Sequence, residues 1–174
     1  MINKKKLREN ILNQPPINQN TEIDKKKTLA EKWFVNLRDQ ICNNFAKIEY
    51  NFKINNNFEK VSEVKSPIFK QKKWDRDGGG GGVISIMKGD VFEKVGVNIS
   101  TVYGKFSDKF KSQIPGAEKT GDFWASGISV VAHMNNPFVP AAHMNTRFLV
   151  TGLGENRKFW FGGGCDLTPM LPDK

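Results

Sequence analysis

The chain has 174 residues, of which 38% are hydrophobic, and these include 13 Phe and 4 Trp. This length and composition suit one folded domain with a real core and leave little room for a second. No stretch approaches 18 uninterrupted apolar residues, and the basic N-terminus has no apolar run behind it. We therefore expect neither a membrane span nor a secretory signal.

The formal net charge of +9 belongs almost entirely to the first part of the chain. Residues 1–73 contain 16 Lys/Arg and 8 Asp/Glu, a net of +8, which leaves +1 for residues 74–174. A basic excess can attract nucleic acid or an anionic surface. Lysines on solvated faces explain it more simply, so we do not expect a nucleic-acid partner.

The two cysteines, Cys42 and Cys165, have neither the spacing of a zinc site nor that of a redox motif. We interpret them as free thiols in a reducing compartment, the cytoplasm, and a disulfide between them is the alternative.

One helix is predicted near the start of the chain. Residues 1–20 are rich in Asn, Gln and Lys and predict a disordered or frayed tail, so we assign the folded domain to residues 21–174. From Thr28 to about Tyr50, apolar residues recur at three- and four-residue spacing. This spacing predicts an amphipathic helix whose buried stripe is Leu29, Trp33, Phe34, Leu37, Ile41, Phe45 and Ile48. Residues 51–66 predict a loop with, at most, a short strand or turn.

Strand patterns fill the rest of the chain. They cover residues 68–74, 83–87, 95–103, a segment from 123 or 126 to 133, 143–151 and 158–161, with a tight turn at 88–90 and a loop or excursion over 104–122. Pro137 and Pro140 make the link between the fourth and fifth segments a loop rather than a tight hairpin. Many strands joined by turns, with a helix ahead of them, predict an α+β fold in which a flat antiparallel sheet is flanked by helices.

The glycine run Gly78–Gly82 lacks the Gly-Lys-Ser/Thr ending of a nucleotide loop. We interpret it as a flap or a place where the backbone approaches a flat ligand, and an irregular link is the alternative.

The stretch from 126 to 169 holds the candidate chemistry, including both histidines of the chain. His133 and His143 suit acid–base work near neutral pH, although a hydrogen-bonded structural histidine is the simpler interpretation of either one alone. Strand alternation puts Asn145 and Arg147 on one face, where Arg147 needs either a protein carboxylate such as Asp166 or a ligand carboxylate. Asp166 follows three glycines, which favour a sharp turn and close approach of a substrate, or it caps a helix that begins near residue 167.

Several ordered motifs together resemble the oxygen-dependent coproporphyrinogen III oxidase family. They are the run from Trp74 through Gly82, then VFEKVGVNIS, GISVVAH, NPFVP, HMNTRF and WFGGGCDLTP. The resemblance covers about residues 28–172. It implies a homodimeric haem-biosynthesis enzyme with a flat antiparallel sheet between helices. Such an enzyme oxidatively decarboxylates two propionates of coproporphyrinogen III to give protoporphyrinogen IX, with molecular oxygen as co-substrate and no organic cofactor.

The resemblance also implies roles for individual residues. His143 matches the proton donor, Asp166 matches the acid that faces the pyrrole nitrogens, and His133 matches a ligand proposed for a divalent metal. The residues that match substrate-binding positions are Ser129, Asn145, Thr146 and Arg147. Family members continue well beyond the Asp-Leu-Thr-Pro motif, so we expect this chain to be the N-terminal part of the family's domain, with an incomplete sheet. The alternative function is an inactive or split-gene fragment that binds a tetrapyrrole or a complementary chain without turnover.

Overall fold

The computed structural model describes residues 22–56, 68–154 and 157–171. One long helix, α2 (Glu22–Asn55), precedes three strands, β1 (Lys70–Asp75), β2 (Gly80–Met87) and β3 (Phe92–Lys105). A single-turn helix, α3 (Asp108–Lys111), follows, and then come β4 (Asp122–Met134), β5 (Ala141–Thr151) and β6 (Lys158–Thr168). The tail expected over residues 1–20, and most of the loop expected after α2, lie outside the described residues.

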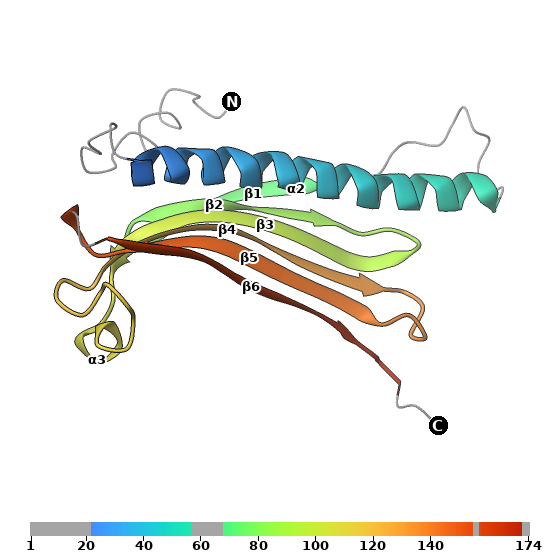
Figure 1. Ribbon diagram of the computed structural model, residues 1–174. Helices are drawn as coiled ribbons and strands as arrows, with labels where there is room; N and C mark the ends of the chain where they lie inside the picture. Colours follow the sequence, from blue (N-terminus) through green and yellow to red (C-terminus); the bar gives the residue numbers. More distant parts are fainter. Residues whose placement is uncertain (1–21, 57–67, 155–156, 172–174) are drawn as a thin grey trace.

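The six strands form one antiparallel sheet in the order β1-β2-β3-β4-β5-β6, so each strand pairs with its neighbours in sequence. This arrangement confirms the predicted α+β class. Figure 1 shows α2 lying along one face of the sheet and α3 on the side of the opposite face, at one end. In the part of the chain that the structure describes, no helix is long and apolar enough to cross a membrane.

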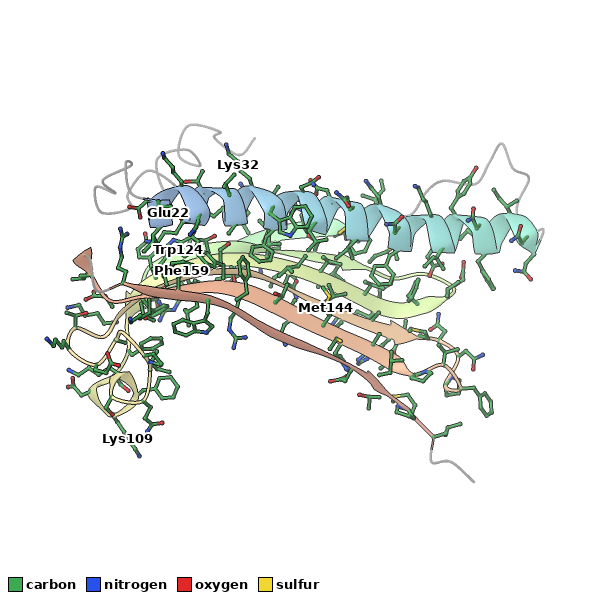
Figure 2. All side chains as sticks on the ribbon, viewed as in Figure 1. Glu22, Lys32, Lys109, Trp124, Met144 and Phe159 are labelled. Carbon is green, nitrogen blue, oxygen red and sulfur yellow. The ribbon has the colours of Figure 1, made fainter. Side chains whose placement is uncertain are left out.

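Helix α2 buries a stripe with four-residue spacing against β3 and β4. The stripe contains small and polar residues besides Phe34: Ala30, Arg38, Cys42, Ala46 and Glu49. Strand residues such as Val95, Val97, Ile128 and Phe148 complete the core on that face. Figure 2 shows Trp124 beneath the helix and Lys32 on its far side. Burial of this apolar surface holds the helix to the sheet.

The predicted helix stripe is partly wrong. The helix itself is confirmed, but it is longer than expected at both ends. Leu29, Trp33 and Ile48 are 66%, 55% and 46% exposed, although Leu37, Ile41 and Phe45 do pack against the core. The helix is therefore turned so that the smaller residues Ala30 and Ala46 allow close approach to the sheet.

Two glycine segments also differ from expectation. Gly80–Gly82 are paired residues of β2, so most of the five-glycine run is neither a flap nor an irregular link. Gly162–Gly164 and Asp166 lie within β6, paired with β5, so Asp166 follows no sharp turn and caps no helix. Side chains at Gly80, Gly81 and Gly82 would strike a neighbouring strand, as would one at Gly163, whereas a Cβ at Gly164 would have no atom within 4 Å. A Cβ at Gly82 would contact the Ile99 carbonyl, and one at Gly163 would contact the Asn145 carbonyl.

Both cysteines are free, as the sequence predicts. Cys42 is buried between α2 and the sheet, and Cys165 is exposed on β6.

Strand β6 is an edge of the sheet and is poorly covered. Its residues Phe159, Phe161 and Leu167 are 43%, 66% and 70% exposed. They share the face that packs on α2, because their partners in β5 include the buried Phe148. Helix α2 packs mainly on β3 and β4, whereas β6 lies at the edge of the sheet (Figure 1).

Candidate functional site

The candidate residues gather on the face of the sheet opposite α2. Directly paired residues of antiparallel strands point to the same face. Ser129 pairs with Asn145, Gly127 with Arg147, and His143 with Asp166, so all these side chains belong to one face. Thr146 pairs with the buried Ile128 and therefore has its side chain on the helix face. The predicted alternation of Asn145 and Arg147 against Thr146 and Phe148 is confirmed.

A cavity of about 290 Å³ lies on this open face. It is lined from both sides of the sheet centre, by Ser129, Asn145, Thr146 and Arg147 on β4 and β5, and by Trp74, Asn98 and Ser100 on β1 and β3. At Gly127 the backbone of the sheet forms the floor of this cavity, because glycine has no side chain. A Cβ added at Gly127 would lie 2.8 Å from the Cβ of Arg147. The structure thus brings the side chains of three predicted substrate-binding residues, Ser129, Asn145 and Arg147, to one cavity, while the Thr146 side chain lies on the helix face.

Arg147 carries an uncompensated charge in this cavity. Its Nη1 donates to Asn145 Oδ1 at 3.2 Å, and the residue is exposed. Among the described residues, no carboxylate lies within ion-pair distance of the guanidinium. Asp166, one of the two partners that the sequence allowed, contacts His143 and Thr168 instead. An anionic ligand is therefore the remaining interpretation among those partners.

His133, His143 and Asp166 form a hydrogen-bonded chain beside the cavity. The Nδ1–H of His143 donates to Asp166 Oδ1 at 2.7 Å, and the Thr168 hydroxyl donates to the same oxygen at 3.2 Å. The hydrogen bond from His143, with a smaller contribution from Thr168, lowers the pKa of the Asp166 carboxyl below its usual value. Asp166 therefore remains ionised at neutral pH and fixes the tautomer of His143.

The two histidines meet through their other nitrogens. His133 Nε2 and His143 Nε2 lie 3.4 Å apart, with the rings nearly perpendicular. Because neutral His143 carries its proton on Nδ1, its Nε2 presents a lone pair that His133 can approach as a donor. The ten-residue separation in sequence had left this contact undetermined.

The same pair has the geometry of two metal ligands. Nitrogens bound to one tetrahedral ion at about 2.0–2.1 Å lie about 3.4 Å from each other, which matches the observed separation. The hydrogen bond from His143 to Asp166 is the usual support for a metal-bound imidazole. No group of three or more His, Cys, Asp or Glu residues suited to a metal occurs within the described ranges, so the pair supplies only part of a coordination sphere.

Sequence analysis missed three residues of this site. Trp74, Asn98 and Ser100 were interpreted only as strand residues and as members of motifs that carry the family resemblance, with no role in a site. Their positions follow from the register of β1, β2 and β3, which the sequence does not specify. The available signal was the alternation of Asn98 and Ser100 within an otherwise β-branched strand.

The described residues thus form an open antiparallel sheet backed by one long helix, with Arg147 and a His–His–Asp chain on the face opposite the helix. Residues 29–174 match the family described as coproporphyrinogen III oxidase. The chain belongs to this family.

Its similar curated relatives carry the same name. The chain is 51% identical over 150 residues to the oxygen-dependent coproporphyrinogen-III oxidase of Rickettsia bellii (strain OSU 85-389), which covers 86% of the chain and 50% of that relative. It is equally 51% identical to the protein of that name from Rickettsia africae, over 148 residues, 85% of the chain and 49% of the relative. The chain therefore spans about half the length of the curated relatives it matches.

Proposed function

We propose that the chain provides the substrate-binding sheet for oxygen-dependent conversion of coproporphyrinogen III to protoporphyrinogen IX in haem biosynthesis. The observation that carries the proposal is Arg147, a guanidinium at a cavity with no carboxylate partner among the described residues. A propionate of the substrate is a bidentate partner for it. Asn145, which already orients the guanidinium, and Ser129 on the paired strand supply further polar contacts.

In this reaction the C–COO⁻ bond and one C–H bond on the neighbouring carbon break in each of two propionates, and a vinyl C=C bond forms. Each propionate thereby releases carbon dioxide, one proton and two electrons, and dioxygen takes up the two electrons from each propionate. Because one proton leaves with each decarboxylation, the site needs groups that move protons. Asp166 accepts a hydrogen bond from a pyrrole N–H, and His143 exchanges a proton at Nε2 with the substrate or with His133. The short Asp166–His143 contact supports these roles because it holds the imidazole in one tautomer.

No organic cofactor is part of the proposal. A divalent metal fits the pair formed by His133 and His143 as two of its ligands, with the others outside the described residues. When bound there, a metal would supply Lewis-acid chemistry and hold oxygen ligands. The proton-transfer role of His143 at Nε2 and metal ligation at the same atom are mutually exclusive, so metal dependence of turnover separates them.

We propose a homodimer in the cytoplasm as the working state. The unpaired thiols of Cys42 and Cys165 fit a reducing compartment. Exposed apolar side chains on the edge strand β6 need cover, which a second copy of the chain could supply.

The same edge favours a second candidate function. A chain equivalent to the second half of the relatives could cover Phe161 and Leu167 and extend the sheet from β6. In that case the chain described here would bind the tetrapyrrole alone but turn it over only with its complement.

The experiment is an oxygen-started turnover assay. Coproporphyrinogen III is added anaerobically to the purified chain, oxygen is admitted, and protoporphyrin fluorescence is followed after oxidation of the product, with a no-protein control. The proposal predicts product formation that falls about 10²- to 10⁴-fold in Asp166→Asn and His143→Gln, while Asp77→Asn, an exposed acid in the β1–β2 turn, matches the wild type. Substrate binding without turnover would favour the second candidate, and absence of binding would refute both.

A further inference from the structure

The open face continues beyond the residues discussed so far, as far as strand β1. One row of directly paired residues crosses the sheet from Arg147 to Trp74, by way of Gly127, Ser100 and Gly82. A Cβ at position 82 would lie 2.9 Å from Cζ2 and Nε1 of Trp74. The indole therefore lies across the sheet, over Gly82, at the cavity that it lines.

The row has the dimensions of a tetrapyrrole. Three strand spacings separate Gly82, beneath the indole, from Arg147, which is about 14 Å. Between them, Ser100 and Gly127 leave no bulky side chain above the sheet. A macrocycle with one propionate directed at Arg147 would reach the indole with its far side.

The adjoining row carries an unpaired polar group. Asn98 pairs with Ser129, which pairs with Asn145, and all three line the cavity. The Asn98 Oδ1 atom is buried and has no hydrogen-bond partner among the described residues. A buried amide oxygen without a donor is unfavourable, so a ligand that brings an N–H group would relieve it after rotation of the side chain.

We propose that Trp74 and Asn98 form the second wall of the substrate site. Trp74 packs against one pyrrole ring through its indole face, and Asn98 accepts a hydrogen bond from a pyrrole N–H. This inference rests on the proposed function, because a porphyrinogen is the ligand that combines carboxylates for Arg147 with four N–H donors. Asp166 alone cannot accept from all of them. Asn98 lies on β3 beside the row that joins Arg147 to Trp74, whereas Asp166 lies three strands away on β6, so Asn98 is an acceptor on a part of the face away from Asp166.

The test uses Trp74→Ala, Trp74→Phe and Asn98→Leu in the full 174-residue chain. Each variant is titrated anaerobically with coproporphyrinogen III. Loss of the indole contact is expected to weaken binding on the order of 10-fold in Trp74→Ala, with most of the affinity retained in Trp74→Phe. Trp33→Ala, a tryptophan lost from the exposed side of α2, is the matched control and should bind like the wild type.

A second ligand separates a direct hydrogen bond from a structural effect. Coproporphyrin III, the oxidised ring, has two fewer N–H donors than coproporphyrinogen III. Asn98→Leu should therefore lower the ratio of affinities for the reduced over the oxidised ring, on the order of 10-fold. A folding defect would weaken both ligands together and leave this ratio unchanged.

The outcomes distinguish this inference from the function on which it rests. If Trp74→Ala and Asn98→Leu bind both ligands like the wild type while Arg147→Ala loses affinity, the second wall is wrong and the proposed function stands. If the ratio of affinities for the reduced over the oxidised ring is unchanged in Asn98→Leu, the proposed hydrogen bond from a pyrrole N–H to Asn98 is refuted. If the wild-type chain binds no coproporphyrinogen III, the proposed function fails, and this inference with it.

Discussion

The buried carboxylate of Glu49 is the clearest point at which one substitution should loosen the fold. Glu49 is fully buried near the end of α2. Its two oxygens accept backbone N–H bonds from Asp90 (2.9 Å), Val91 (3.0 Å) and Phe92 (2.8 Å) in the β2–β3 turn. A Cβ at Gly89 would strike this carboxylate, so the turn is fitted closely around it.

Glu49→Gln keeps the shape but removes the charge and one acceptor. The new amide NH₂ group would face one of the backbone donors, and the remaining bonds would become neutral ones. Bonds to charged groups contribute roughly 1.5–3 kcal/mol, and a buried donor left unpaired costs about 1–3 kcal/mol, so we expect a loss of about 3 kcal/mol. For a chain of this length that corresponds to a fall in Tm of roughly 6–12 °C.

Urea and thermal unfolding followed by circular dichroism measure this loss. The matched control is Glu93→Gln, because Glu93 is an exposed acid just beyond the same turn, and its variant should unfold like the wild type. Equal stabilities of Glu49→Gln and Glu93→Gln would refute the view that this carboxylate clamps α2 to the turn.

Two further predictions concern other buried groups. Burial raises the pKa of the Cys42 thiol to about 11, so at pH 8 only about one molecule in a thousand carries the Cys42 thiolate. Iodoacetamide should therefore label Cys165 and leave Cys42 unmodified until the chain is unfolded. Equal labelling rates of the two cysteines in the folded chain, measured by mass spectrometry, would contradict this. Asp24 is buried and pairs with Arg157 at 3.0 Å, which joins the start of α2 to the β5–β6 connection. Asp24→Asn should lower the free energy of unfolding by about 3 kcal/mol, whereas Glu22→Gln, in an exposed ion pair, should have no measurable effect. Equal unfolding curves for the two variants would show that the buried ion pair does not stabilise the fold.

Local sequence patterns predicted the strands well, because side chains alternate between the two faces of a strand whichever strand it pairs with. Asn145 and Arg147 share a face as predicted, and Phe148 is buried on the other. The glycines before Asp166 were misinterpreted because glycine tolerates both a turn and a strand. These glycines form a strand rather than a turn because they pair with β5, where Gly163 lies against the Asn145 carbonyl.

The orientation of α2 was the main error of the sequence interpretation. Hydrophobicity favoured burial of Trp33 and Leu29, yet the helix buries Glu49 and Arg38. The partners that satisfy Glu49 are backbone groups more than 40 residues away. No local pattern contains such a contact, so a polar residue at a buried position could not be distinguished from a polar residue in solvent.

The site was predicted more completely on β4 and β5 than on β1 and β3. Both histidines, Arg147 and Asp166 stood out as unusual residues in apolar or glycine-rich surroundings. Trp74 and Asn98 are ordinary in a strand, and only the register across four strands brings them to the same cavity.

The most direct test of the substrate site is anaerobic equilibrium binding of coproporphyrinogen III to the wild-type chain and to Arg147→Ala. We expect saturable binding that weakens about 10- to 100-fold when the charge-assisted contact to a propionate is lost. Lys88→Ala, which removes one positive charge from the exposed β2–β3 turn, should bind like the wild type. Equal affinities of all three proteins, or no binding by the wild type, would contradict the assignment of this face as the substrate site.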